Sequence, residues 1–465
     1  MSAQTLFEKL WQAHNICALD GGEDLLYIDR IFLHERTGGI ALVNMARTGR
    51  TVRRPNHVFA TMDHIVDTRL GRSDETLMPG GSKFITITRR AAKQAGITLF
   101  DLGDARQGIV HVISPEQGIV LPGLTIVCPD SHTCTQGAFG ALAFGIGSTG
   151  AEHAMATSTL RLSKPKSMLV LFDGILQTGV TAKDMILHVI SKYGSAGGRG
   201  YAIEFAGAAV RALDMESRMT LCNMAVEFGA FTGLVAPDAK TYAWLKDRPY
   251  APKNEAWDAA VENWQELKTD PKAKFDKTIE VNVGAIAPTV SWGTSPAQSV
   301  FINENIPPPT SPEDKKSLAY MGLKGGQKMT SLKVDGAFIG SCTNARLPDL
   351  RAAAAVLRGR RVHSNIRALC VPGSSSVKRA AEDEGLDVIF KRAGFEWRES
   401  GCSMCFYAGG EGFGSGERVI STTNRNFEGR QGVGVRTHLA SPATVAASAV
   451  AGHICDARSL EVRRG

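Results

Sequence analysis

The sequence predicts an α/β protein built on largely parallel sheets, because strand-like and helix-like segments alternate along it. Residues 124–128 and 167–172 are short apolar runs typical of buried strands. Helix starts are expected at 149–152 and 181–184, where a threonine stands three positions before an acidic residue, as in a capping box. An alanine-rich helix is expected around residues 352–357.

A chain of 465 residues has room for two or three domains. The stretch 269–333 is rich in proline and charged turns, and we expect it to connect an N-terminal unit to a C-terminal one. Residues 194–200 are glycine-rich but lack the Gly-Lys-Ser/Thr ending of a phosphate loop. They are interpreted as a turn, with a backbone cradle for a carboxylate as the alternative.

Composition narrows the functional classes. The chain is 43% hydrophobic and 21% charged, it shows no apolar run of membrane-spanning length, and its start has no secretory pattern. Few cysteines and no disulfide framework indicate a cytoplasmic protein. The net charge of +7 comes from 53 basic against 46 acidic residues. The most basic segments, 358–361 and 463–464, are short and lack interleaved aromatics, so nucleic-acid binding is not indicated. Surplus arginine also fits a carboxylate-bearing substrate.

Three cysteines carry the strongest chemical signal. Cys342 follows the apolar run 336–339 in a Gly-Ser-Cys-Thr-Asn turn, and Cys402 and Cys405 form a Cys-x-x-Cys pair. Three thiolates suit an iron–sulfur cluster whose fourth iron has no protein ligand, and such an iron acts as a Lewis acid. Structural zinc, which normally has a fourth ligand, and buried inert thiols are the alternatives.

Two Asp/His groups lie in the N-terminal half. Asp63 precedes His64, and the segment 129–133, Pro-Asp-Ser-His-Thr, directly follows a predicted strand. A carboxylate beside an imidazole favours the protonated ring, which can then donate a proton at neutral pH. Ligands of open α/β sheets usually bind at strand ends. A structural hydrogen bond is the alternative for either pair, and His111, after an apolar run, taken alone is a core histidine.

A third group is the segment 423–430, Thr-Asn-Arg-Asn-Phe-Glu-Gly-Arg. Its two arginines, Arg425 and Arg430, suit bidentate binding of carboxylates. A basic surface loop is the alternative interpretation.

Together these residues resemble a known family. The chain is similar, almost end to end, to the large subunit of 3-isopropylmalate dehydratase in the aconitase superfamily. The resemblance is carried by six motifs: Ala-Thr-Met-Asp-His at 60–64, Asp-Ser-His-Thr at 130–133, Gly-Ala-Phe-Gly-Ala at 137–141, Cys-Asn-Met-Ala-Val-Glu at 222–227, Gly-Ser-Cys-Thr-Asn at 340–344 and Asn-Arg-Asn-Phe-Glu-Gly-Arg at 424–430.

The resemblance implies three α/β domains, at 1–165, 166–285 and 286–465, around one [4Fe-4S] cluster per chain with one iron lacking a protein ligand. It implies a hydro-lyase that interconverts 2- and 3-isopropylmalate in leucine biosynthesis. The implied cluster ligands are Cys342, Cys402 and Cys405. The implied catalytic residues are Asp63, His64, His111, Asp130, His132 and Glu227, with His111 and Glu227 acting together. The implied substrate-binding residues are Ser131, Asn223, Asn344, Asn424, Arg425 and Arg430.

One part of an aconitase is missing. In single-chain aconitases a mobile fourth domain supplies a serine base and another arginine, and this chain ends near the point where that domain would begin. The family solution is a separate small subunit that completes a site for a small dicarboxylic hydroxy acid. We therefore expect the chain alone to be inactive. We expect the active enzyme to be a heterodimer of this chain and that small subunit.

The chain also departs from the family pattern. Ile40 and Ala345 stand where the family has a glutamine and a serine, and residues 406–410, Phe-Tyr-Ala-Gly-Gly, replace a Leu-Ala-Met-Asn sequence. Lost polar groups change which substrate is held. A paralogous hydratase of maleate, citraconate or dimethylmaleate is therefore the main alternative. A cluster-sensing RNA-binding protein is a lesser one, since it needs a longer chain and a basic cleft.

Overall fold

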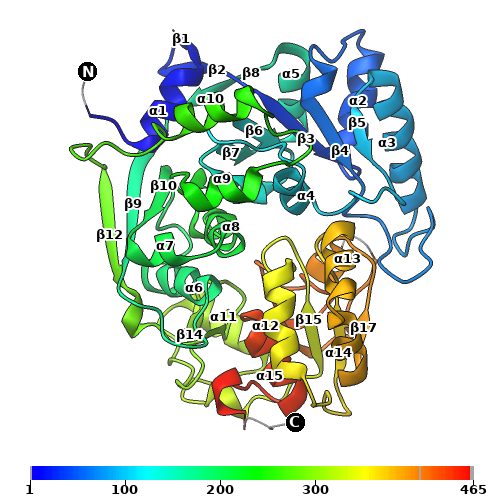
Figure 1. Cartoon of the computed structure of the whole chain (residues 1–465). Coiled ribbons are helices and arrows are strands. Elements are labelled where there is room, and N and C mark those ends of the chain that lie inside the picture. Colours follow the sequence, from blue (N-terminus) through cyan, green and yellow to red (C-terminus); the bar gives the residue numbers. More distant parts are fainter. Residues whose placement is uncertain (1–2, 408–409, 461–465) are drawn as a thin grey trace. The chain divides into compact units, whose positions relative to one another are not determined.

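The structure is a computed structural model that describes residues 3–407 and 410–460 (Figure 1). The described chain divides into two compact units, each assembled from three separate segments. Unit 1 comprises Met1–Asp63, Ser82–Gly174 and Ala196–Asn282, and unit 2 comprises His64–Gly81, Ile175–Ser195 and Val283–Gly465. The three-domain division expected from the sequence uses different boundaries from these units and stays a prediction.

Unit 1 contains two parallel sheets and a small antiparallel one. The first is five-stranded in the order β5-β4-β3-β6-β7, with β3 at Arg30–His34, β4 at Val58–Thr61, β5 at Thr98–Phe100, β6 at Thr125–Cys128 and β7 at Leu142–Gly145. The second is four-stranded in the order β11-β10-β9-β12, with β9 at Lys166–Asp173, β10 at Tyr201–Ala206, β11 at Thr232–Leu234 and β12 at Lys277–Asn282. The antiparallel sheet is β1 (Asn15–Leu19), β2 (Glu23–Tyr27) and β8 (Thr159–Ser163).

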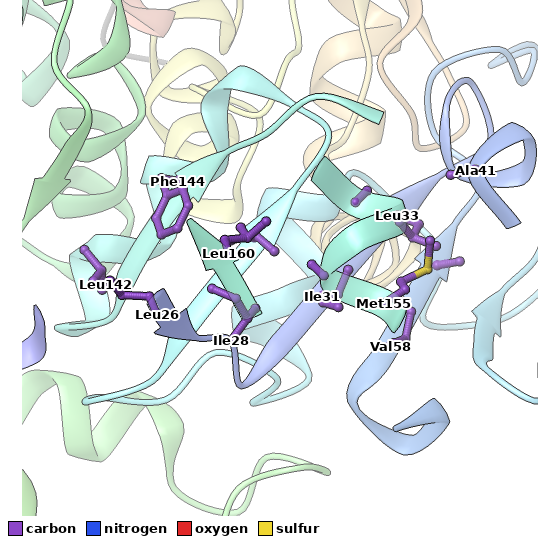
Figure 2. Packing of buried hydrophobic residues seen from close by; sticks show 14 of the residues in the cluster. Leu26, Ile28, Ile31, Leu33, Ala41, Val58, Leu142, Phe144, Met155 and Leu160 are labelled. Atoms are coloured by element: carbon purple, nitrogen blue, oxygen red, sulfur yellow. The ribbon is translucent and has the colours of Figure 1, made fainter. Parts of the chain in front are cut away.

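Two helices pack against the first sheet of unit 1. α2 and α5 contact each other and β3. The helices of unit 1 are α1 (Leu6–His14), α2 (Gly38–Arg47), α3 (Gly81–Ala95), α4 (Val110–Glu116), α5 (Ser148–Thr157), α7 (Ala208–Ala212), α8 (Met215–Asn223), α9 (Ala239–Leu245) and α10 (Glu255–Trp264), with short 3-10 helices η1 (Pro55–His57), η2 (Ser131–Phe139) and η3 (Val226–Phe228). Figure 2 shows part of the core, where Leu33 and Val58 from the sheet pack with Met155 of α5.

Unit 2 contains a second five-stranded parallel sheet, in the order β17-β16-β15-β18-β19, and a two-stranded antiparallel pair, β13-β14. The strands are β13 (Thr289–Ser291), β14 (Ser299–Phe301), β15 (Gly336–Ile339), β16 (Arg367–Cys370), β17 (Phe395–Trp397), β18 (Arg418–Ser421) and β19 (Arg436–Leu439). The helices are α6 (Ala182–Tyr193), α11 (Pro312–Met321), α12 (Leu347–Leu357), α13 (Ser375–Asp383), α14 (Leu386–Ala393) and α15 (Pro442–Ala451), with η4 (Val283–Ala285), η5 (Met329–Ser331), η6 (Ser403–Cys405) and η8 (Ala457–Ser459). α12 and α15 pack together, and α15 contacts β15.

Most of the predicted elements are confirmed. The apolar runs at 124–128 and 167–172 correspond to β6 and β9, and the alanine-rich run lies in α12. The capping box before α6 is present, because the Asp184 carboxylate accepts both the N–H and the hydroxyl of Thr181, at 2.8 and 2.7 Å. The predicted N-cap at Thr149 is wrong by two residues, since the N-cap of α5 is Gly147 and the helix begins at Ser148.

The stretch 269–333 is more than a connection. It contributes β12, which pairs with β9 in the four-stranded sheet, and then the β13-β14 pair and α11. Its prolines stand beside these elements or at a helix start: Pro312 is the first residue of α11, behind an N-cap at Ser311. Proline frequency marked element boundaries here, not the absence of elements. No helix in the described ranges is long and apolar enough to cross a membrane.

Candidate active site

Polar residues follow three neighbouring strands of unit 1. β3 ends at His34 before Glu35, β4 ends shortly before Asp63, and β6 ends shortly before Asp130. Since β4, β3 and β6 are adjacent and parallel, their carboxyl ends meet at one edge of the sheet. The Nε2 atom of His34 lies 3.1 Å from the carbonyl oxygen of Pro129, which joins the ends of β3 and β6.

Two buried histidines at this edge each contact a carboxylate. His111, in α4, has its Nε2 atom 3.0 Å from Oδ1 of Asp130. His132, in η2, has its Nε2 atom 2.9 Å from Oε1 of Glu227. Asp130 also accepts the backbone N–H of His132 at 2.8 Å, as the N-cap of η2. Oδ1 of Asp130 also lies 3.7 Å from Nδ1 of His132, so the carboxylate of Asp130 faces both imidazoles. Imidazoles oriented by carboxylates in this way are arranged to hold and deliver a proton.

Asp63 is fully buried and held by backbone contacts. Its Oδ2 atom accepts the N–H of Val110 at 3.1 Å, and its own N–H donates to Oε2 of Glu35 at 3.1 Å. Ligand-type atoms of His34, Glu35 and Asp63 all lie within 4.8 Å of one another. His64 follows Asp63 and is half-buried.

The other predicted residues of unit 1 surround the histidines. Asn223 is the last residue of α8, which packs against η2, and its amide donates to the Thr135 hydroxyl at 2.8 Å. Ser131 is exposed at the start of η2. The sequence could not give the pairing of these groups: Glu227, expected to act with His111, contacts His132, while Asp130 contacts His111.

In unit 2 the three cysteines lie on two turns near one hydroxyl group. Cys342 follows β15. Cys402 is the N-cap of η6 and Cys405 its last residue, and the Cys405 N–H donates to the Cys402 carbonyl at 2.9 Å. The Ser341 hydroxyl lies 3.9 Å from the Cys342 sulfur and 3.2 Å from the Cys405 sulfur. The three thiols are buried and not in disulfides.

Nitrogen donors also reach these sulfurs. Nδ2 of Asn424 lies 3.5 Å from Sγ of Cys342, and Nη2 of Arg430 lies 3.6 Å from Sγ of Cys405. Donors of this kind stabilise thiolates and tune a bound metal centre. Elsewhere burial raises the pKa of the Cys128, Cys222 and Cys370 thiols well above the usual value, so those groups stay protonated and inert.

Backbone strain accompanies the cysteines. Ser341, before Cys342, has a φ of 79°, and Ser403, after Cys402, has a φ of 45°. Left-handed conformations cost a non-glycine residue about 1–2 kcal/mol. Such strain persists where the surrounding structure requires it, often at functional sites.

Arg430 is packed between two aromatic rings. Its guanidinium carbon lies 4.6 Å from the ring centroid of Phe406 and 5.3 Å from that of Phe427. Arg430 is buried, whereas Arg425 is half-buried. Phe406 thus acts on a predicted substrate-binding arginine directly.

The remaining departures lie in different surroundings. Ala345 is buried, and Ile40 is 45% exposed on α2. Within the altered segment 406–410, Ala408 and Gly409 lie outside the described residues.

Sequence reasoning missed one residue of unit 2. The Nζ atom of Lys183 lies 2.8 Å from the Thr422 carbonyl, 2.7 Å from the Thr423 carbonyl and 3.4 Å from Oδ1 of Asn344. Burial lowers the pKa of Lys183 to about 7, although the nearby Asp349 and Asp184 carboxylates act in the opposite direction. The available signal was a lysine inside a helix start whose following residues, 185–187, are all apolar.

Unit 1 also had an overlooked pair, His34 and Glu35. They stand at the end of an apolar run, Ile31–Leu33, and a His-Glu pair in that position is a strand-end signal of the same kind as the segment 129–133.

The fold and these residues define an α/β protein with parallel sheets and polar groups gathered at the carboxyl ends of its strands. The chain belongs to the aconitase family, described as "Aconitase family (aconitate hydratase)", which it matches over residues 8–452. It is accordingly a hydro-lyase of the aconitase type, and proteins of this family typically bind a [4Fe-4S] cluster.

Proposed function

We propose that the protein is a [4Fe-4S]-dependent hydro-lyase that interconverts 2- and 3-isopropylmalate together with a separate small subunit. The observation that carries the proposal is the cysteine site of unit 2, whose sulfurs are contacted by donors from Ser341, Asn424 and Arg430. The isopropylmalate assignment is supported by the six motifs shared with that dehydratase.

The residues of the cysteine site fit an iron–sulfur cluster. Cys342, Cys402 and Cys405 would ligate three irons, and the hydroxyl, amide and guanidinium donors would offset the negative charge on sulfur. When bound, the cluster would supply a Lewis acid that polarises the hydroxyl group leaving the substrate.

The residues of unit 1 would handle the protons of the same reaction. Dehydration needs an acid that protonates the departing hydroxyl and a base that removes the carbon-bound proton, a role that the resemblance gives to a serine of the small subunit, and rehydration reverses both transfers. His132 with Glu227 and His111 with Asp130 are suited to the transfer at the hydroxyl in both directions, because each carboxylate lies within hydrogen-bond distance of the imidazole and orients it. His64, which begins a segment of unit 2, would deliver the proton with the preceding Asp63, and Arg425 and Arg430 of unit 2 would bind the carboxylates.

The proposal is tested with the full chain, reconstituted anaerobically and co-expressed with a small-subunit-like protein. We expect iron and acid-labile sulfide in equal amounts, a broad visible absorption band, and enoate formation from 2-isopropylmalate. Zinc instead of iron would contradict the cluster. An iron–sulfur protein that ignores isopropylmalate would contradict the substrate.

A second candidate, hydration of a smaller maleate-type acid, is supported by Phe406. Its ring occupies the space beside the Arg430 guanidinium, 4.6 Å away, and bulk at this point favours a substrate without a large alkyl group. Robust hydration of maleate or citraconate, with no turnover of isopropylmalate, would establish this candidate over the first.

A further inference from the structure

Lys183 is the only lysine among the buried residues that the structure describes, and none of its surface is exposed. It is the second residue of α6, which packs against β13 and β14. A buried ammonium group is unfavourable unless hydrogen bonds and opposite charge compensate it. The groups that compensate the buried ammonium of Lys183 therefore have to be identified, which would be unnecessary for a solvent-exposed lysine.

Three acceptors surround the three ammonium protons of Lys183. Two are the backbone carbonyls of Thr422 and Thr423, at 2.8 and 2.7 Å, just after β18. The third is the side-chain oxygen of Asn344, at 3.4 Å, two residues after Cys342. The acceptors come from two turns that lie 161 and 239–240 residues away in the chain.

One of these turns carries Cys342, and the other contacts its sulfur through Asn424. The Thr422 hydroxyl exchanges hydrogen bonds with the backbone of Gly340, at 2.9 Å in each direction, and Asn424 contacts the Cys342 sulfur. β15 and β18 are adjacent strands, so the turns leave the same edge of the sheet. The ammonium group is thus a third connection between them, and the charged groups acting on it include Asp349, Asp184, Cys342 and Cys405.

We propose that Lys183 is a positioning residue whose buried amino group, when protonated, fixes the Cys342 turn and the 422–425 turn together and adds positive charge to the turn that carries Cys342. It would preform the site before the cluster is inserted and strengthen cluster retention afterwards. This inference rests on the proposed function only in its second part, because the connection between the turns exists in the cluster-free chain.

The first test uses the cluster-free full chain and Lys183→Met, which keeps the length of the side chain and removes the charge. Hydrogen exchange of the amides in 340–346 and 421–426 should become about tenfold faster, while the strands of unit 1 keep their protection. Lys192→Met, an exposed position on the same helix, should change neither segment. Unchanged exchange in Lys183→Met would overturn the inference.

If Lys183→Met does not fold, Asn344→Ala replaces it in this test. It removes one acceptor of Lys183, and the expected result is faster exchange in the distant segment 421–426. Protection there equal to that of the unaltered chain would overturn the inference.

The second test uses the reconstituted protein. Lys183→Met should lose iron to a chelator about tenfold faster than the unaltered protein or Lys192→Met, and the cluster it retains should have a more negative reduction potential. A merely structural role would leave that potential unchanged, and an unchanged potential with unchanged iron loss would overturn the inference. If the unaltered protein takes up no cluster, the proposed function fails, and the exchange experiment still decides whether Lys183 joins the two turns.

Discussion

The five-stranded sheets of the two units have the same strand order and different chemistry. Counted in chain order within each sheet, the strands run third, second, first, fourth, fifth in both. The first and fourth strands, β3 and β6 in unit 1 and β15 and β18 in unit 2, are therefore neighbours. In such sheets the connections leave these two strands in opposite directions, and ligands bind at their carboxyl ends.

Both units place polar residues at that point, but of different kinds. In unit 1 the ends of β3 and β6 carry histidines and carboxylates, and His34 joins them through its contact with Pro129. In unit 2 the ends of β15 and β18 carry cysteine and asparagine, and Lys183 joins them through three acceptors. The strand order fixes where chemistry can occur, and under the proposed function the residues at two strand ends decide whether protons or a metal centre are handled there.

The comparison predicts its largest effect for Cys405→Ser in unit 2. A serine is a poor ligand for iron, so the protein should hold no intact cluster and dehydration should fall below detection. Iron and sulfide analysis with an activity assay of the two-subunit enzyme measures both. Cys370→Ala, which removes a buried thiol at the end of β16, is the control and should keep its cluster. A full iron content in Cys405→Ser would contradict the ligand assignment.

The next largest effect is expected in unit 1, for His132→Gln. Glutamine cannot transfer a proton, so activity should fall about 10²–10⁴-fold. Iron content and the visible spectrum should stay unchanged, because unit 1 supplies none of the proposed cluster ligands. His153→Gln, at an exposed position on α5, should retain full activity. Loss of the cluster in His132→Gln would show that the two functions are not divided between the units as proposed.

The sequence predicted where the site residues stand relative to the strands better than it predicted which residues they contact. Asp130 and Cys342 were expected from motifs that follow apolar runs, and both stand just beyond the ends of strands. That inference needs only local pattern. The capping box of α6 was equally local, and Thr181 with Asp184 confirms it.

Contacts between distant segments could not be predicted in the same way. Lys183 meets acceptors 161 or more residues away, and no local pattern reports which carbonyls a buried ammonium group will find. The partners of His111 and His132 depend on how η2 packs against α8, which a motif does not specify. The prediction that Thr149 caps a helix is wrong because α5 already begins at Ser148. Alternative starts one or two residues apart compete within the first turn of a helix, so a local motif does not fix the boundary.

A smaller effect concerns stability, which should depend on pH in opposite directions at one histidine of each unit. In unit 2, burial, with the positive charge of Arg418 beside it, lowers the pKa of His438 to about 3. The unfolded chain then binds a proton below pH 6.5 that the folded one does not, so stability is present above that pH and is lost as pH falls. From pH 6.5 to 5 the loss is about 2 kcal/mol, at roughly 1.4 kcal/mol per pH unit.

In unit 1, the pKa of one histidine is shifted in the opposite direction. Burial alone would lower the pKa of His14, but its hydrogen bond with Asp29, at 2.9 Å, raises it. Its contribution is therefore present below pH 6.5 and lost as pH rises through the raised pKa. Urea unfolding between pH 5 and 8 should show a flatter acid side for His438→Gln and a smaller gain on acidification from pH 8 for His14→Gln. Identical pH profiles for all three proteins would contradict both assignments.

The smallest effect concerns Phe406 and separates the two candidate substrates. An aromatic face on a partly desolvated guanidinium contributes about 1 kcal/mol. Phe406→Leu should therefore hold Arg430 less firmly and raise the KM for the dicarboxylic substrate about fivefold. Phe427→Leu is the matched comparison: its ring is farther from the guanidinium, 5.3 Å against 4.6 Å, and 44% exposed, so its effect should be smaller.

The pattern across substrates carries the argument. If Phe406 acts only through Arg430, the KM for isopropylmalate and for maleate should rise together, because both present a carboxylate to the same guanidinium. If the ring instead limits the room for an alkyl group, Phe406→Leu should improve isopropylmalate relative to maleate. The first pattern supports isopropylmalate as the substrate, since the Phe406 ring then does not exclude a substrate with a large alkyl group. The second supports the maleate-type hydratase, and an unchanged KM for both acids would remove Phe406 from the carboxylate site.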